Sequence, residues 1–210
     1  MIVMPSNQSG ATFGWLAGRF TGKLGWLLSP DGWRTPYHWI EYALDNGAFQ
    51  AFTNEESWDE DAYVGMLEKA RLVPRPPRWV LAPDVVADKP ATLDLWIQWR
   101  KALRDYGWPL AFAVQDGMTQ ADVPKDADVI FVGGSTAWKR RTVLDWCRNN
   151  RRVHVGRVNG YDFLKGCHDA GAESCDGTGW FRGDQVQLGG LDRYLEESTT
   201  GVWAQERLCG

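Results

Sequence analysis

Carboxylate side chains follow three apolar segments of the 210-residue chain, at the point where each segment breaks into a loop. Asp45 ends YALD, Asp84 ends VLAPD and Asp176 ends ESCD. Carboxylates around one pocket can divide the labour between a nucleophile and an acid or base, because their environments separate their pKa values. An Asp nucleophile suits glycosyl carbons, where it forms a covalent intermediate. The three residues therefore indicate nucleophilic or acid–base chemistry, provided that the fold brings them together.

Amides, glycines and an arginine follow three other apolar segments. Gln115 ends LAFAVQ, a Gly133-Gly134 pair ends VIFVGG, and Gly156 and Arg157 lie in RVHVGRV. A carboxylate, an amide and exposed backbone at a Gly-Gly break together offer the donors and acceptors that a purine edge requires. These residues are therefore candidates for binding a base.

Metal binding is the competing use of clustered Asp residues. The three His residues, His38, His154 and His168, show neither i, i+4 pairing nor an HxH pattern. We therefore expect no His-rich metal site, whereas a site that uses the Asp residues as metal ligands stays open as an alternative.

The elements that would position these residues alternate regularly. Short apolar segments, each typical of a parallel strand covered on both faces, occupy 2–6, 25–30, 42–47, 79–84, 110–115, 129–134, 152–158 and, more weakly, 173–179. Amphipathic stretches predict helices over 58–70, 91–106, 136–149 and 161–170, and a last helix over 191–195 and some of the residues after it. The first two connections look irregular.

Eight strands alternating with helices predict an α/β fold, a single (β/α)8 barrel over residues 1–210, with a doubly wound open sheet as the alternative. In a parallel barrel, the C-terminal ends of the strands converge on one face, where reactions occur. The carboxylates, amides and glycines at the segment ends would then share one mouth.

Composition limits the partners. The formal net charge of -4 gives no overall electrostatic reason to bind nucleic acid or an anionic membrane. Two local basic clusters, 139–141 and Arg148 with Arg151 and Arg152, indicate either phosphate contacts or solvated helix faces. The 13 Trp residues favour packing in the core, with stacking on bases or rings as the alternative.

The cysteines and the N-terminal segment indicate a cytoplasmic protein. Cys147, Cys167, Cys175 and Cys209 have no metal-ligand spacing, and we expect them to be reduced thiols. MIVMPSNQSG lacks the basic and apolar regions of a signal peptide, and no apolar run approaches the roughly 18 residues of a membrane span. We expect no membrane partner and no cofactor.

The ordered series LDNGAF, LAPDV, AVQDG, FVGGS, VHVGRVNG and SCDGTGW resembles the tRNA-guanine transglycosylase superfamily over about residues 40–180. Those enzymes are (β/α)8 barrels that exchange a guanine base for a 7-deazaguanine. The resemblance implies that Asp176 is the nucleophile and that Asp45 shuttles the proton. Trp180 and Phe181 would pack on a base or sugar, or between the barrel and its helices. The substrate-binding residues expected on these grounds are Asp84, Gln115, Gly133, Gly134, Gly156 and Arg157.

Departures from the family pattern bear on the substrate. The tRNA enzymes carry a C-terminal zinc site of closely spaced Cys and a His, which has no counterpart after Asp176, and this chain is shorter and not basic. It is closer to the small relatives of bacteriophages and genomic islands, which insert 7-deazaguanines into DNA. The expected partners are therefore a nucleic acid, DNA in preference to tRNA, and a free 7-deazaguanine base.

Two other functions remain open. One is a metal- or phosphate-using barrel enzyme that acts on a small sugar or nucleotide. The other is a non-catalytic relative that binds nucleic acid or protein through a Trp-rich surface.

Overall fold

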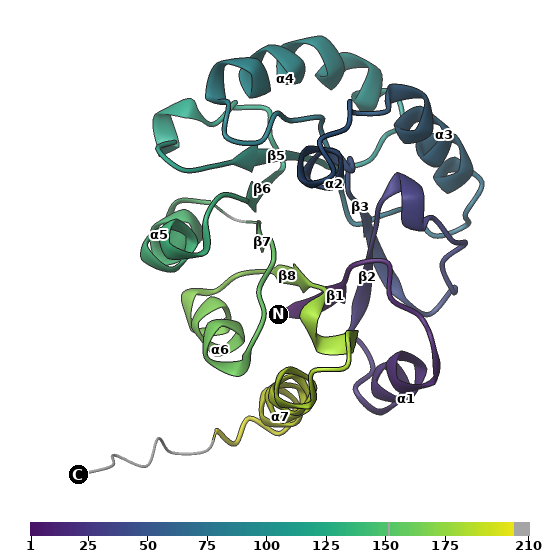
Figure 1. The fold of residues 1–210 in the computed structure, drawn as a ribbon, viewed down its shortest axis with the longest axis vertical. Coiled ribbons are helices and arrows are strands. Elements are labelled where there is room, and N and C mark those ends of the chain that lie inside the picture. The colour runs from purple at the N-terminus through teal and green to yellow at the C-terminus, as the bar shows by residue number, and fades with distance from the viewer. Residues whose placement is uncertain (151, 204–210) are drawn as a thin grey trace.

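Eight parallel strands pair in the order β1-β8-β7-β6-β5-β4-β3-β2 in the computed structural model, which describes residues 1–150 and 152–203. The strands are β1 (Ile2–Pro5), β2 (Gly25–Leu28), β3 (Glu41–Leu44), β4 (Val80–Leu81), β5 (Leu110–Val114), β6 (Val129–Val132), β7 (Val153–Val155) and β8 (Ser174–Gly177). The first and last strands of this order meet through two isolated parallel bridges, Val3–Leu24 and Ser6–Leu27. The sheet therefore closes almost completely, and the predicted (β/α)8 barrel is confirmed (Figure 1).

Helices surround the strands (Figure 1). They are α1 (Ala11–Arg19), α2 (Ala48–Thr53), α3 (Glu60–Arg71), α4 (Lys89–Arg104), α5 (Thr136–Asn149), α6 (Tyr161–Ala170) and α7 (Gln185–Thr200). Side chains at the N-cap positions fix several starts: Asp59 accepts a hydrogen bond from the Ala62 N–H, and Ser135 accepts one from the Trp138 N–H. The predicted helices over 136–149 and 161–170 match α5 and α6, and the last helix is longer than predicted.

The prediction that the first connection is irregular is wrong, because this connection contains α1. Gly14 and Gly18 lower the intrinsic helix propensity of this segment. Phe13, Leu16 and Ala17 are nevertheless buried on one face of the helix, and this tertiary packing stabilises it. The second connection contains only a single short 3-10 turn, Pro30–Gly32, and is irregular as predicted.

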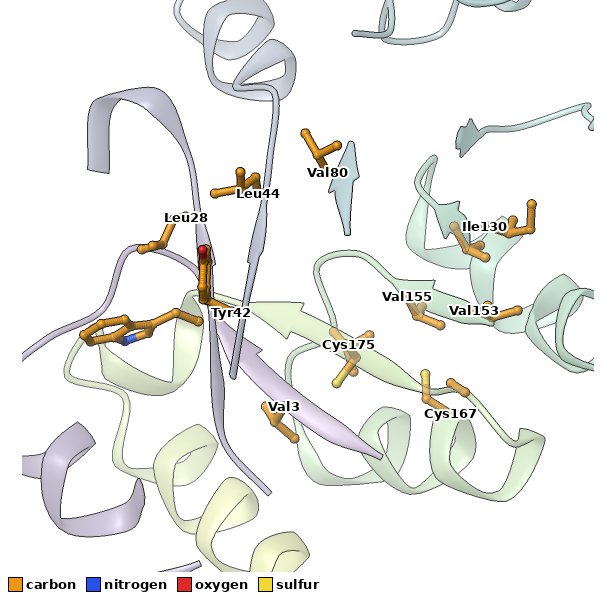
Figure 2. Packing of buried hydrophobic residues seen from close by; sticks show 14 of the residues in the cluster. Val3, Leu28, Tyr42, Leu44, Val80, Ile130, Val153, Val155, Cys167 and Cys175 are labelled. Carbon is orange, nitrogen blue, oxygen red and sulfur yellow. The ribbon is translucent and has the colours of Figure 1, made fainter. Parts of the chain in front are cut away.

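Alternate strand residues build two apolar layers. One layer fills the barrel and consists of Met4, Leu27, Ala43, Trp79, Leu81, Ala111, Ala113 and Val129, with Ile2 and Phe131 against it. The other lies between the strands and the helices and includes Val3, Leu28, Tyr42, Val80 and Val155 (Figure 2). Side chains that are two residues apart in a strand point to the same face. Because Ala43 and Ala113 face inward, Asp45 and Gln115 point toward the barrel axis as well.

Most of the Trp residues pack in these layers, as predicted. The buried ones are Trp26, Trp79, Trp96, Trp99, Trp108, Trp138, Trp146 and Trp180. Trp180 is fully buried, and the ring of Phe181 contacts Phe13 edge-on at 6.1 Å between centroids. These two residues therefore pack between the barrel and its helices, so the alternative of a base or sugar contact does not describe Trp180.

The N-terminal end of the barrel is closed by ion pairs. Arg152 donates from Nε to Glu173 Oε2 at 2.7 Å, and Arg78 bonds both Glu173 and Glu41. Arg152 thus lies at the face opposite the mouth, outside a helix and paired with Glu173, so the expected solvated helix face is wrong for it. Arg148 is exposed, and Arg151 lies outside the described residues.

Two sequence expectations concern the remaining features. No helix among the described residues is long and apolar enough to cross a membrane. Cys147, Cys167 and Cys175 are free thiols, as expected, and Cys209 lies outside the described residues.

Candidate active site

Three carboxylates from distant parts of the chain meet at the C-terminal rim of the barrel. Burial, and after it the neighbouring charges of Asp176 and Asp84, raises the pKa of Asp45 to about 7, against hydrogen bonds from the Gly47 and Asn46 backbone. Burial also raises the pKa of Asp84 to about 6. The structure therefore brings together the three acidic residues that the sequence singled out, and it gives two of them pKa values close to neutral pH.

Asp176 is held in a defined orientation. Its side chain is buried, and its Oδ1 accepts a hydrogen bond from the Arg157 N–H at 3.1 Å. The hydroxyl of Ser6 donates to Oδ2 at 3.2 Å. Arg157 adopts a left-handed backbone conformation, with φ of 52°, which turns its N–H toward the carboxylate. Both oxygens of the buried carboxylate thus have a fixed hydrogen-bond donor.

Gly156 leaves room for the Phe131 ring next to this carboxylate. A Cβ at this position would lie 2.9 Å from two ring atoms of Phe131 and 3.4 Å from Asp176 Oδ1. The backbone of Gly156 is bound on both sides, because its N–H donates to the Val132 carbonyl and its carbonyl accepts from Lys139 Nζ. Gly156 is therefore a packing requirement of the Asp176 site.

His154 also contacts Asp176, and the sequence did not predict this contact. Its Nε2 lies 3.0 Å from Asp176 Oδ1, and its Nδ1 lies 2.8 Å from Ser174 Oγ. The ring is fully buried inside the barrel, stacked on Phe131 and edge-on to Trp79. The spacing of the histidines did not indicate this role. The signal that could have found it is that His154 and Ser174 lie two residues before the predicted site residues Gly156 and Asp176, so they point to the same face of their strands.

Asn46 holds Asp84 and was also missed. Its Nδ2 donates to Asp84 Oδ1 at 2.7 Å and to the Ala82 carbonyl at 2.8 Å, while its Oδ1 accepts from the Ala48 N–H. The Asn46 side chain is buried. This amide therefore links the end of β3 to the segment after β4 and stabilises a negative charge on Asp84.

Gln115 approaches Asp84 from the other side. Its Nε2 donates to the Val85 carbonyl at 2.9 Å and to Asp84 Oδ2 at 3.2 Å, and its Oε1 accepts from the Ala87 N–H. Both ends of the amide are thus engaged by the segment that carries Asp84. In this structure Gln115 positions Asp84, and it presents no unpaired group to the mouth.

The Gly133-Gly134 break connects β6 to α5. The Gly133 N–H donates to the Val114 carbonyl at 2.9 Å, and Gly134 has φ of 75°. A Cβ on Gly134 would lie 2.3 Å from Asp116 Oδ2, which accepts from the Ser135 N–H and so fixes the start of α5. The Gly134 backbone is therefore close to the rim, and its carbonyl accepts from Arg157 Nη2 at 2.7 Å.

Arg157 reaches across the mouth. Its exposed guanidinium lies over the ring of Phe49, 4.0 Å from the ring centroid. Phe49 belongs to α2, which follows Asp45, whereas Arg157 follows β7 on another part of the rim. The two side chains thus connect the Asp45 and Asp176 sides of the site.

The residues of the basic cluster at 139–141 lie in two different environments. Lys139 is fully buried, and its Nζ donates to the backbone carbonyls of Gly156 and Arg157. The expectation that Lys139 contacts phosphates or lies on a solvated face is therefore wrong. Arg140 and Arg141 are exposed, and Arg140 stacks on the Phe163 ring.

Among residues 1–150 and 152–203, no group of three or more His, Cys, Asp and Glu side chains is arranged to hold a metal ion. No protein-family model and no curated protein matches the chain. The geometry of the site and the order of the motifs are therefore the grounds on which a function can be assigned.

Proposed function

We propose that this protein is a base-exchange transglycosylase that replaces guanine in a nucleic acid, DNA in preference to tRNA, with a 7-deazaguanine. The observation that carries the proposal is the pairing of two unlike carboxylates. Asp176 is fixed by donors from Ser6 and Arg157 and by its contact with His154 Nε2, and beside it Asp45 has a pKa of about 7. This pairing fits a nucleophile with an acid–base partner.

In the first half-reaction, Asp176 attacks C1′ of the target nucleotide. A bond forms between a carboxylate oxygen and C1′, the C1′–N9 bond breaks, and its electron pair leaves with guanine. The departing guanine takes a proton from the Asp45 carboxyl group. The product is an ester between Asp176 and the sugar, as expected for a carboxylate nucleophile at a glycosyl carbon.

In the second half-reaction, the incoming 7-deazaguanine loses its N9 proton to the Asp45 carboxylate. N9 then bonds to C1′, and the ester oxygen of Asp176 leaves with its electron pair. Asp45 has regained its proton, so the cycle needs no other acid or base. A pKa of about 7 suits this double role, because both protonation states are accessible near neutral pH.

The other rim residues would bind the substrate. Asp84, held by Asn46 and Gln115 after β4, and the backbone at Gly134 after β6 would offer acceptors to a purine. Arg157 is placed to contact a phosphate. The target base must leave the stack to reach a barrel mouth, and the reaction would occur in the cytoplasm of a bacterium or an infected host cell.

The test is covalent trapping. Wild-type protein incubated with a guanine-containing DNA oligonucleotide should form an adduct that survives denaturation, and Asp176→Ala should form none. Asp94→Asn, which alters an exposed carboxylate in α4, is the matched control and should trap as wild type does. Base exchange that persists in Asp176→Ala would overturn the assignment.

A second experiment identifies the nucleic acid that is modified. Nucleoside mass spectrometry of DNA and tRNA from cells that express the protein and receive a deazapurine should find the modified nucleoside in DNA. Its appearance in tRNA alone would reverse the preference for DNA.

A further inference from the structure

We infer that Ser174 and His154 form a buried relay that orients Asp176 and leaves its Oδ2 as the oxygen that reacts. This inference rests on the proposed function and deepens it. His154 is a positioning residue here, because it contacts the nucleophile and not the substrate.

The chemistry of the partners assigns the hydrogen atoms. Asp176 Oδ1 of an ionised carboxylate only accepts, so His154 Nε2, 3.0 Å away, must carry a hydrogen. In a neutral ring Nδ1 is then an acceptor, and the Ser174 hydroxyl, 2.8 Å away, is the donor that satisfies it. Ser174 therefore selects the tautomer in which Nε2 donates to the nucleophile.

Packing keeps the ring in this orientation. His154 is fully buried, with Phe131 stacked at 4.9 Å and an interplanar angle of 24°, and Trp79 edge-on at 4.7 Å. The register of the barrel sets the relay, because His154 pairs with Ser174 across β7 and β8. A turn of the ring would have to displace two aromatic side chains from the interior layer.

The two oxygens of Asp176 are consequently unequal. Oδ1 has two donors, His154 Nε2 and the Arg157 N–H, which occupy its two lone-pair directions. Oδ2 has one donor, the Ser6 hydroxyl at 3.2 Å, and keeps a lone pair for C1′. In the ester, Oδ1 becomes the carbonyl oxygen, and its donors stabilise the charge that returns to the carboxylate in the second half-reaction.

The kinetic test compares two substitutions of one ring. His154→Phe retains a ring but removes the donor, and it should slow single-turnover trapping at saturating oligonucleotide by about 10- to 100-fold, the usual effect of a lost hydrogen bond to a charged group. His154→Gln supplies an N–H in place of Nε2 and should recover most of the rate. Oligonucleotide affinity should be unchanged in both variants. His168→Phe, outside the barrel interior, is the matched control and should trap normally.

The tautomer gives a measurement that does not depend on activity. The chain has three His residues, so long-range ¹H–¹⁵N spectra of their rings can be assigned with the single variants. We expect the hydrogen on Nε2, where it faces Asp176 Oδ1, and we expect Ser174→Ala to relax this preference. A hydrogen on Nδ1, or on both nitrogens, at neutral pH would overturn the relay even if His154→Phe failed to fold.

The two hypotheses fail differently. If wild-type protein forms no adduct, the proposed function fails, and the tautomer alone decides the relay. If wild-type protein forms the adduct and His154→Phe forms it equally fast, the relay fails while the proposed function stands.

Discussion

The proton on Asp45 links the site to the stability of the fold. Burial, with the charges of Asp176 and Asp84, raises its pKa from 3.8 to about 7. Between these values the folded protein binds a proton that the unfolded chain has released, so the free energy of unfolding falls as the pH rises through this window. A neutral residue in place of Asp45 should remove this part of the decrease in the free energy of unfolding.

Asp45→Asn should therefore stabilise the protein at high pH. Its melting temperature should equal that of the wild type near pH 4, where Asp45 is protonated, and exceed it at pH 8, where the wild type carries a charge that its surroundings disfavour. Calorimetric or circular-dichroism melts at pH 4, 6 and 8 would measure the difference. A variant that melts below the wild type at pH 8 would show that the charge on Asp45 is stabilised by its surroundings.

The same proton governs catalysis in the proposed mechanism. The first half-reaction needs protonated Asp45, so the trapping rate of the wild type should decline as the pH rises above about 7. Asp45→Asn should trap about 100- to 10,000-fold more slowly and lack this inflection. Single-turnover trapping from pH 5.5 to 8.5 measures both effects, and an inflection near 7 that persists in the variant would assign it to another group.

Gly156 tests the steric requirement of the nucleophile. In Gly156→Ala the added methyl would lie 2.9 Å from the Phe131 ring, which must shift, and 3.4 Å from Asp176 Oδ1, which is an ordinary contact. The Phe131 ring stacks on His154, which contacts Asp176, so its shift would disturb the nucleophile. We expect a loss of about 1–3 kcal/mol in the free energy of unfolding together with slower trapping. Gly166→Ala, where nothing lies within 4 Å, is the control and should retain full trapping activity. Normal stability and trapping in Gly156→Ala would show that Phe131 yields freely.

The elements show where sequence patterns suffice and where they do not. The apolar segments predicted all eight strands, because a strand covered on both faces forms a nearly continuous apolar run. The weakest of these segments was that of β8, which contains Ser174 and Asp176. The segment of α1 contains Gly14 and Gly18, which disfavour a helix, and it forms one because Phe13 and Leu16 pack in the core. Intrinsic propensity and tertiary packing oppose each other in this helix, and packing wins.

Helix α1 should therefore be easy to stabilise. Gly14→Ala should raise the free energy of unfolding by about 0.5–1 kcal/mol, because nothing lies within 4 Å of the added methyl. Gly10→Ala is the opposite control: the space is equally open, but φ is 108°, so alanine should destabilise. Urea denaturation of the two variants measures both signs, and destabilisation by Gly14→Ala would mean that α1 requires its glycine for an unseen reason of packing.

The site was predictable only in part, and the missing residues share a cause. Asp45, Asp84 and Asp176 could be named because each ends an apolar segment and all parallel strands end at one rim. The contact between His154 and Ser174 depends on the register of β7 against β8, which a single sequence does not contain. Lys139 looked solvated in its helix, and only the turn after β7 supplies the carbonyls that bury it.

The closure of the barrel is uneven around its circumference. Most neighbouring strands share ladders, whereas β1 and β2 meet through isolated bridges, with the Val3 N–H bonded to the Lys23 carbonyl and the Asn7 N–H to the Leu27 carbonyl. Asn7 fastens the upper end of this seam. Its Nδ2 donates to Ser29 Oγ at 2.7 Å, and its Oδ1 accepts from the Ser29 N–H at 3.0 Å.

Asn7→Gly should open this seam without straining the backbone, because φ at this position is 53° and glycine adopts that conformation readily. The amides of Val3 and Asn7 should exchange with solvent faster, while those of the β5–β6 ladder should keep their protection. Trapping should slow as well, because the preceding residue, Ser6, donates to Asp176 Oδ2. Asn7→Asp retains the acceptor for the Ser29 N–H, so its exchange and trapping rates should lie between those of the wild type and Asn7→Gly. Hydrogen exchange measured at each residue distinguishes local opening of this seam from a general loss of stability. If exchange in β5 and β6 accelerated equally, the barrel would open as one unit, and the nucleophile would not depend on this seam in particular.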